Sequence, residues 1–177
     1  MKLIILDRDG VINHDSDAFI KNPDEWRPLP GSLEAIARLY KAGYRVVVAT
    51  NQSGVARGLF DLATLGRINA KMQQAVAAAG GRIDAVFFCP HGPDAGCACR
   101  KPKPGMILEI LQRFKTVPAE VHAIGDHLRD LQAAHAAGCR PVLVLTGKGQ
   151  ATMKKGDLPP DTVVRVDLAA VAAELAP

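Results

Sequence analysis

Short apolar runs recur along the chain, and a longer stretch of mixed polarity follows most of them. Each run is four or five residues long and ends near a polar residue or a glycine. Runs of this kind are typical of strands that are buried on both faces of a parallel sheet. Six such strands are predicted, the last weaker than the others: Lys2–Leu6, Arg45–Ala49, Ala85–Cys89, Val121–Ile124, Pro141–Leu145 and Val163–Val166.

The intervening stretches carry signals for the ends of helices. Ser and Asp favour the N-cap, Pro the first turn and Gly the position after the last turn. They delimit five predicted helices: one capped by Ser32 that runs through Lys41 to Gly43, one capped by Asp61 that runs to Gly80-Gly81, Met106–Lys115 behind Pro104, Leu128–Ala137 before Gly138, and Leu168–Leu175 behind the cap Asp167. This alternation predicts an α/β fold with a doubly wound, mostly parallel sheet and right-handed crossovers.

Three segments are too long or too mixed to be simple turns. Asn13–Pro30 contains Phe19, Pro23 and Trp26 and is predicted to form an ordered flap. Cys89–Lys103 is also oversized, and Thr146–Pro160 is predicted to be a surface connection. No repeat and no linker divides the chain, so we expect a single domain over residues 1–177, with the loop 89–103 inside it.

Composition and charge narrow the functional class only slightly. The chain has 177 residues, of which 48% are hydrophobic and 5% aromatic, and its formal net charge is +4. This charge suits a small anionic substrate as well as nucleic acid, but few aromatic residues argue against a surface that stacks bases. No transmembrane stretch and no leader peptide are expected, which favours a cytoplasmic protein with free thiols or metal sites rather than disulfides.

Polar side chains follow three of the predicted strands where each strand ends. Asp7 and Asp9 follow the first, Thr50 follows the second, and Asp126 with Asp130 follows the fourth. The carboxyl ends of parallel strands meet at one edge of a sheet, where ligands bind. Carboxylates in small number suit Mg²⁺, which binds beside a substrate phosphate. An isolated Asp-x-Asp-Gly turn is the alternative. A calcium loop is disfavoured because a strand precedes the motif and Val11-Ile12-Asn13 follow Gly10 where further oxygen ligands are needed.

The set Asp7-Arg8-Asp9-Gly10, Thr50-Asn51, Lys101 and Gly125-Asp126 resembles the four motifs of the haloacid dehalogenase-like (HAD) phosphatases, and the resemblance covers nearly the whole chain. The resemblance implies a Rossmann-like core without a cap domain. It implies Asp7 as nucleophile and Asp9 as general acid and base, with Thr50 and Lys101 stabilising the phosphoryl group. Mg²⁺ would be held by Asp7, by the backbone carbonyl of Asp9 and by Asp126. Asp130 would lie in the next layer around the metal.

Three thiols and an imidazole lie close together in the loop that precedes Arg100-Lys101. Ligands at C-x-H and C-x-C spacing suit a tetrahedral, structural Zn²⁺, and these are Cys89, His91, Cys97 and Cys99. The alternative is two buried cysteines and a surface histidine. A zinc ion here would fix the loop and place the cations that follow it. Cys139 lies elsewhere and is predicted to be simply buried.

Two HAD families share this start and a zinc loop that leads into Cys-Arg-Lys-Pro. The segments Thr50–Gly58 and Cys99–Met106 resemble the D-glycero-D-manno-heptose-1,7-bisphosphate 7-phosphatases more than the histidinol-phosphate phosphatases, which tend to carry Asp at the position of Ser53. The resemblance implies hydrolysis of the 7-phosphate of a sugar bisphosphate on the route to ADP-heptose and lipopolysaccharide. It implies substrate contacts by Asp15, Asn51, Gln52, Ser53, Arg100, Lys101 and His127.

One position departs from that family, which often has Lys where this chain has His127. If His127 keeps the role of the lysine, its charged form is needed and substrate binding weakens as the pH rises above about 6.5 to 7.

The sequence leaves three other functions open. They are a histidinol-phosphate phosphatase, a phosphatase of nucleic-acid 3′ ends, and an inactive interaction module stabilised by zinc. For the favoured reading we expect a sugar bisphosphate as the partner, no nucleic acid, no membrane and a monomer.

Overall fold

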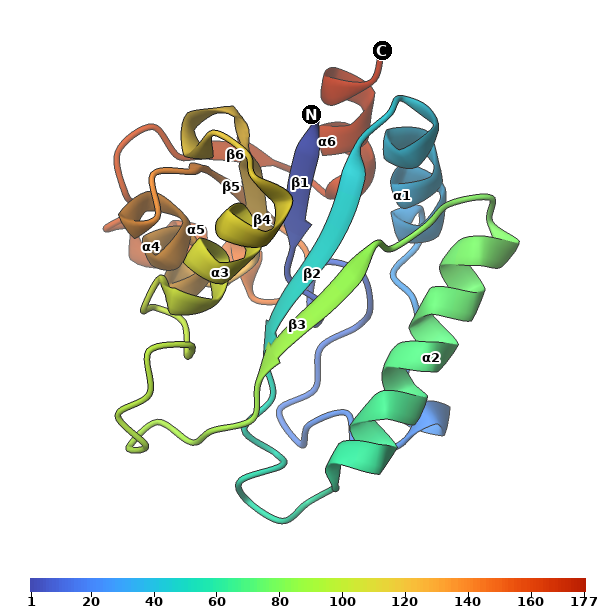
Figure 1. Ribbon diagram of the computed structural model, residues 1–177, viewed down its shortest axis with the longest axis vertical. Helices are drawn as coiled ribbons and strands as arrows, with labels where there is room; N and C mark the ends of the chain where they lie inside the picture. The colour runs from blue at the N-terminus through green and yellow to red at the C-terminus, as the bar shows by residue number, and fades with distance from the viewer.

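A computed structural model describes all residues from Met1 to Pro177, and it is built on one six-stranded sheet (Figure 1). Every neighbouring pair of strands is parallel, and the strand order is β3-β2-β1-β4-β5-β6. This order reverses direction between β1 and β4, which makes their carboxyl ends the switch point of a Rossmann-like sheet. The strands are β1 Leu3–Leu6, β2 Arg45–Asn51, β3 Ala85–Cys89, β4 His122–Gly125, β5 Arg140–Val144 and β6 Val163–Arg165.

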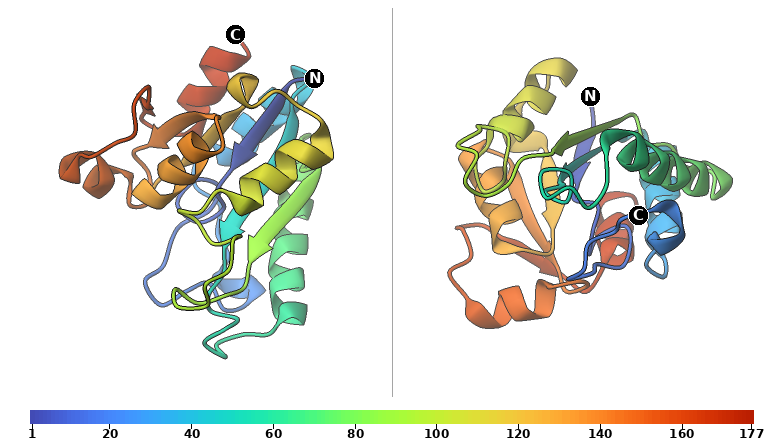
Figure 2. Two further views of the ribbon diagram at one scale, coloured as in Figure 1. Left: turned by 60° about the vertical axis from the view of Figure 1, so that its left-hand side comes forward. Right: turned by 90° about the horizontal axis from the view of Figure 1, so that it is seen from below.

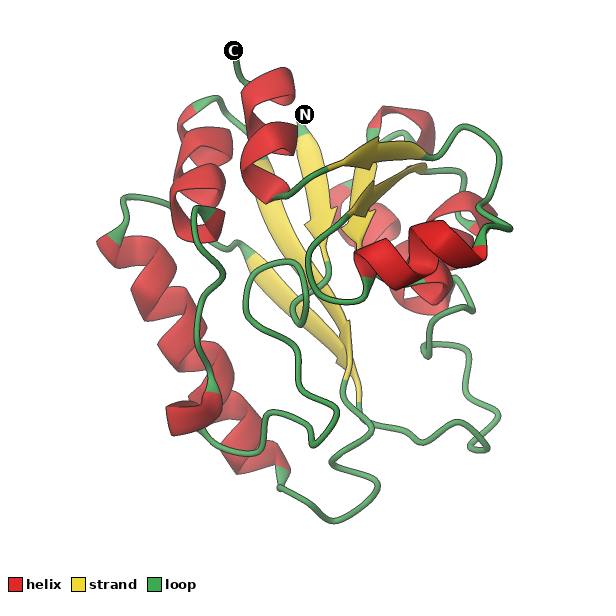
Figure 3. Ribbon diagram, turned by 180° about the vertical axis from the view of Figure 1, so that it is seen from behind, coloured by secondary structure: helices red, strands yellow, loops and turns green.

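Helices cover both faces of the sheet, as Figure 3 shows from behind. Residues of even number in β1, such as Ile4 and Leu6, pack with α1, α2 and α6, whereas Leu3 and Ile5 pack with α3 and α4. Side chains of a strand alternate between faces, so a continuously apolar run supplies both cores. The helices are α1 Ser32–Lys41, α2 Leu62–Ala78, α3 Gly105–Phe114, α4 Leu128–Ala136, α5 Gly149–Lys155 and α6 Leu168–Leu175, with 3₁₀ turns η1 Pro23–Glu25 and η2 Pro118–Glu120. The predicted α/β class and doubly wound topology are confirmed.

Most helix-end predictions are also confirmed. Asp61 and Asp167 accept hydrogen bonds from the backbone amides of Thr64 and Ala170 at 2.7 and 2.8 Å, as N-caps do. The prediction for Ser32 was wrong, because Gly31 is the N-cap and Ser32 is the first helical residue. The Ser32 hydroxyl instead donates to the carbonyl of Ile12 at 2.6 Å and so fastens α1 to the segment after β1.

The segment Thr146–Pro160 is the mostly exposed connection that was predicted, but it also contains α5, which was not predicted. The helix is short and begins at a glycine, so its sequence carries no clear helical period. It is nevertheless anchored, since the Thr152 hydroxyl donates to the carbonyl of Asp126 at 2.8 Å. This contact brings the β5–β6 connection to the carboxyl end of β4.

The segment Asn13–Pro30 forms the ordered flap that was predicted. Trp26 is only 1% exposed, Ile20 is also buried, and η1 lies between Asn22 and Trp26. Figure 2 shows the flap, the β2–α2 loop and the loop after β3 gathered at the same end of the sheet. None of the helices combines the length and the apolar character needed to cross a bilayer.

Candidate active site

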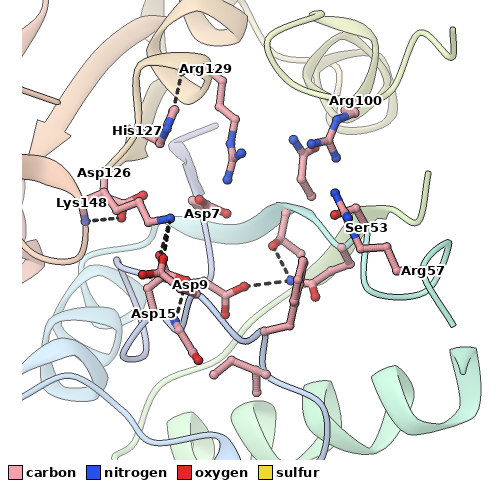
Figure 4. A pocket seen from close by; sticks show the side chains of 17 residues that line it. Asp7, Asp9, Asp15, Ser53, Arg57, Arg100, Asp126, His127, Arg129 and Lys148 are labelled. Atoms are coloured by element: carbon pink, nitrogen blue, oxygen red, sulfur yellow. Dashed lines mark hydrogen bonds and ion pairs between the residues drawn. The ribbon is translucent and has the colours of Figure 1, made fainter. Parts of the chain in front are cut away.

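A cavity of about 230 Å³ lies at the carboxyl edge of the sheet, at the switch point (Figure 4). Seventeen residues line it and only two of them are hydrophobic. The flap closes one side, the β2–α2 loop a second, and the segments after β4 and β5 a third. The structure brings Asp7, Asp9, Asp15, Thr50, Asn51, Gln52, Ser53, Arg100, Asp126 and His127 to this cavity, whereas Lys101 and Asp130 lie behind it.

Asp7 is held at the base of the cavity by a buried lysine. The ammonium group of Lys101 lies 3.1 Å from Asp7 Oδ1 and 2.7 Å from Asp130 Oδ1, and it donates to the carbonyl of Ala49 at 2.8 Å. An ammonium group has three protons, so these contacts occupy all of them. Lys101 is 3% exposed and therefore acts on the cavity through Asp7.

The Asp126 carboxylate lies in a narrow space bounded by backbone atoms. Its Oδ2 accepts the amide proton of Lys148 at 2.8 Å. A Cβ atom added at Gly10 or at Gly147 would overlap this same carboxylate. Gly10 also has φ +83°, a conformation that side chains disfavour. The carboxylate after β4 is thus positioned by residues from the first turn and from the β5–α5 connection.

We expect the substitution Gly10→Ala to lower the affinity for Mg²⁺ by about tenfold or more, because the new methyl group displaces the Asp126 carboxylate. Isothermal titration calorimetry measures the change. Gly43→Ala is the matched control, since Gly43 has φ +86° but open space around its Cα. Equal Mg²⁺ affinities for Gly10→Ala and Gly43→Ala would show that Gly10 is not needed to position the Asp126 carboxylate.

The acidic cluster carries more negative charge than the protein compensates. Oxygens of Asp7, Asp126 and Asp130 lie within 4.8 Å of one another. Burial and the nearby Asp130 raise the pKa of Asp7 to about 7, although Lys101 opposes the shift. Burial and the charge of Asp7 raise the pKa of Asp126 to about 8. A buried group of like charges is relieved by a cation, so Asp7 and Asp126 fit Mg²⁺, and the Asp9 carbonyl stays a predicted ligand.

Mg²⁺ affinity is expected to rise as the pH increases from 6 to 9. Both carboxyl groups must lose their protons before they bind a cation, and their pKa values of about 7 and about 8 place this competition near neutrality. The gain approaches about tenfold per pH unit for each proton displaced. Calorimetry in two buffers of different ionisation enthalpy measures the protons released, and a dissociation constant independent of pH would refute the competition.

Asp9 lies beside Asp7 but in a different environment. Burial alone would raise its pKa, yet the guanidinium of Arg8 and the amides of Asn13 and Gln52 outweigh this and hold the pKa below its usual range. Arg8 donates through Nε and Nη2 at 3.0 and 3.2 Å, and the two amides donate at 2.9 and 3.0 Å. Two adjacent carboxyl groups therefore have shifts of opposite sign, a pattern common at acid–base sites.

Several other predicted residues have their polar groups engaged by neighbours. Asn51 donates to the carbonyl of Lys101 at 3.0 Å and accepts its amide proton at 3.1 Å. This pair of bonds joins the end of β2 to the loop after β3. His127 is the N-cap of α4, and its Nδ1 accepts the amide proton of Arg129 at 3.4 Å. Burial and the charge of Arg129 lower the pKa of His127, so the expectation of a charged imidazole is disfavoured.

Three cations of the cavity were not predicted from the sequence. Arg57 lies over the ring of Phe19 at 5.6 Å. Lys148 lies 3.2 Å from Asp17 and 3.7 Å from Asp15, which joins the flap to the β5–α5 connection. Arg129 enters from the first turn of α4. Arg129 and Lys148 are single basic residues outside any motif, and Arg57 lies in the segment Thr50–Gly58 without a role assigned to it, so no spacing pattern distinguishes these residues from solvated surface charges.

The thiols and imidazole of the loop after β3 form a compact group. Cys89 Sγ lies 3.6 Å from His91 Nδ1, 3.7 Å from Cys97 Sγ and 3.1 Å from Cys99 Sγ. Zinc–sulfur bonds of about 2.3 Å give sulfur–sulfur edges of about 3.8 Å in a tetrahedron, close to the separation of Cys89 and Cys97, whereas Cys89 and Cys99 lie closer together. The residues therefore fit Zn²⁺ with no open position. Arg100 donates to the carbonyl of His91 at 3.2 Å and so connects the loop 89–103, here called the zinc loop, to the cavity.

Comparisons with known proteins agree with this geometry. A family model described as HAD-hydrolase-like matches residues 98–170. The D-glycero-beta-D-manno-heptose-1,7-bisphosphate 7-phosphatase of Bordetella bronchiseptica is 64% identical over 99% of this chain and 98% of its own length, and that of Pseudomonas putida is 55% identical over 99% of both. The crystal structure of the Bordetella enzyme with magnesium and phosphate has a TM-score of 0.98, with 99% of this chain and 98% of that chain covered. The chain belongs to the D-glycero-beta-D-manno-heptose-1,7-bisphosphate 7-phosphatase family of HAD-like hydrolases.

Proposed function

We propose that this protein hydrolyses the 7-phosphate of D-glycero-D-manno-heptose 1,7-bisphosphate and leaves heptose 1-phosphate. The observation that carries the proposal is the 64% identity, over nearly the full length of both chains, to an enzyme of this name that was crystallised with magnesium and phosphate. The charges of the cavity agree, because a polar pocket with carboxylates at its base and arginines at its walls suits a phosphorylated sugar.

In the first half of the reaction, an Asp7 carboxylate oxygen attacks phosphorus and the bond from phosphorus to the sugar oxygen breaks. Lys101 fixes the direction of that carboxylate from behind. The sugar oxygen leaves with a proton from Asp9, whose pKa the incoming phosphate raises by its negative charge. The product of this half is heptose 1-phosphate with an aspartyl phosphate at Asp7, so one difficult displacement is divided into two.

In the second half, water attacks the aspartyl phosphate and inorganic phosphate departs. The network of Arg8, Asn13 and Gln52 favours the carboxylate form of Asp9, which accepts the proton of that water. The hydroxyl of Thr50 accepts a hydrogen bond from Gln52 at 3.0 Å and retains its own proton for a phosphoryl oxygen.

The two metals have separate proposed roles. A bound Mg²⁺ supplies charge neutralisation for the transferring phosphoryl group. The proposed zinc of the zinc loop is structural and acts through the position of Arg100. We place the other substrate contacts at Asp15, Asn51, Gln52, Ser53 and His127, all of which line the cavity.

Phosphate release from a substrate panel tests the proposal. The panel holds heptose 1,7-bisphosphate of both anomers, fructose 1,6-bisphosphate and histidinol phosphate, each with Mg²⁺. We expect the highest kcat/KM for a heptose bisphosphate. A preference for histidinol phosphate would replace the proposed substrate, and a protein that releases phosphate from none of the four would support the zinc-stabilised interaction module.

We further propose the setting in which this reaction takes place. The enzyme is a monomer with a single domain over residues 1–177, it contributes to ADP-heptose and lipopolysaccharide synthesis, and it works in the cytoplasm without binding nucleic acid or membrane. The low aromatic content supports the exclusion of nucleic acid. Light scattering of the purified protein tests the monomer.

A further inference from the structure

Three guanidinium groups line the cavity without an ion pair, and those of Arg100 and Arg129 also lack an aromatic ring beside them. The charge of Arg129 acts on Asp7 and Asp130, but it contacts neither carboxylate directly. Arg129 forms no ion pair, and its buried Nε has no hydrogen-bond partner. The guanidinium group of Arg100 forms no ion pair either, and its one hydrogen bond goes to the backbone carbonyl of His91. Figure 4 shows both guanidinium groups pointing into the same cavity, with the Asp7 carboxylate below Arg129 in that view. Cations placed in this way without partners indicate a bound anion.

The other basic side chains near the cavity already have partners. Lys101 forms ion pairs with Asp7 and Asp130, and Lys148 forms ion pairs with Asp15 and Asp17. Arg57 lies over the ring of Phe19. His127 uses its Nδ1 to cap α4. Arg129 is therefore the charge on the α4 wall that is free to meet a ligand.

The reacting phosphate and the second phosphate need separate cations. The reacting phosphate lies at Asp7 beside a proposed metal, and Lys101 compensates the Asp7 carboxylate from behind, so the charge at this place is largely balanced. The second phosphate carries about −1.5 to −2 charges of its own. Two guanidinium groups on different walls of the cavity, one from α4 and one from the zinc loop, match that charge and offer bidentate donors.

We propose that Arg129 determines specificity by binding, together with Arg100, the phosphate of the substrate that is not hydrolysed. This inference rests on the proposed function, and it assigns to α4 a role that no motif of the chain indicates. Arg129 is the second residue of α4, so the N-terminus of this helix, which also favours anions, lies beside its guanidinium group.

The test compares Arg129→Ala with the parent protein on two substrates, heptose 1,7-bisphosphate and the heptose 7-phosphate that lacks the second phosphate. We expect the KM for the bisphosphate to rise by about 10- to 100-fold, while kcat and both constants for the monophosphate change by less than about threefold. Arg129→Lys should recover part of the loss. Arg129→Gln should show the same loss as Arg129→Ala, and a melting temperature equal to that of the parent would show that the loss does not come from unfolding.

Two control variants and three results decide the inference. Arg113→Ala removes an exposed arginine of α3 and should change nothing. Equal losses on both substrates would overturn the inference, because Arg129 would then act on the reacting phosphate. A bisphosphate-specific loss in Arg57→Ala but not in Arg129→Ala would also overturn it. A parent protein that hydrolyses neither substrate would refute the proposed function itself, and the role of Arg129 with it.

Discussion

The variant Asp7→Asn is expected to lose phosphate release by about four orders of magnitude or more, since the amide oxygen is a very poor nucleophile towards phosphorus. The same change removes one of the carboxylates that fit Mg²⁺, so stabilisation of the protein by added Mg²⁺ should also disappear. Release of phosphate from heptose 1,7-bisphosphate and thermal melting with and without Mg²⁺ measure the two effects.

The metal-free stability of this variant separates lost chemistry from lost structure. The pKa of Asp7 is raised from 3.8 to about 7, so the folded state favours its protonated form. The stability that this shift provides is present below pH 3.8 and is lost as the pH rises through about 7. At pH 8 the charged carboxylate therefore destabilises the metal-free protein, and asparagine removes that cost. The variant should melt no lower than the parent; a lower melting temperature or activity above 1% of the parent would contradict the assignment.

The variant Cys89→Ser should lose both bound zinc and most of its activity. Cys89 is fully buried at the end of β3 and its sulfur contacts the other three proposed ligands. Without zinc the Gly- and Pro-rich loop has no apolar core to order it, and Arg100 loses the fixed carbonyl of His91. We expect kcat/KM to fall by about 100-fold, with elemental analysis showing less than one tenth of the parent's zinc.

Cys139→Ser is the matched control for this variant. Cys139 is also a buried thiol, and burial raises its pKa to about 11, but it lies outside the cluster. The control should retain zinc and kinetics and lose only about 1 kcal/mol of stability from a buried hydroxyl. A zinc-free Cys89→Ser protein with parental kinetics would show that the loop needs no metal.

The strands were predictable because their cores are continuous apolar runs, and the site was predictable where polar residues directly follow them. The prediction fell short where polar residues extend a strand, as at the end of β2, where Thr50 and Asn51 pair with Phe88 and Cys89. Pairing of this kind depends on the neighbouring strand and leaves no mark in the local pattern.

The contacts around Asp126 could not be predicted for a different reason. The group from Lys148 that binds its carboxylate is a backbone amide, which every residue except proline possesses. Arg129 is one basic residue in the first turn of a helix, where charges are ordinary. Its missing counter-ion becomes visible only when every neighbour has been placed.

The position of β1 has a consequence for the order in which the protein can be completed during synthesis. Its two neighbours are β2, which follows within fifty residues, and β4, which begins at His122. A nascent chain that ends before β4 exposes one open edge of its central strand and carries Asp7 without Asp126. Such an edge invites pairing with other chains. At least the first 126 of the 177 residues must therefore leave the ribosome before β1 is paired on both sides and Asp7 meets Asp126.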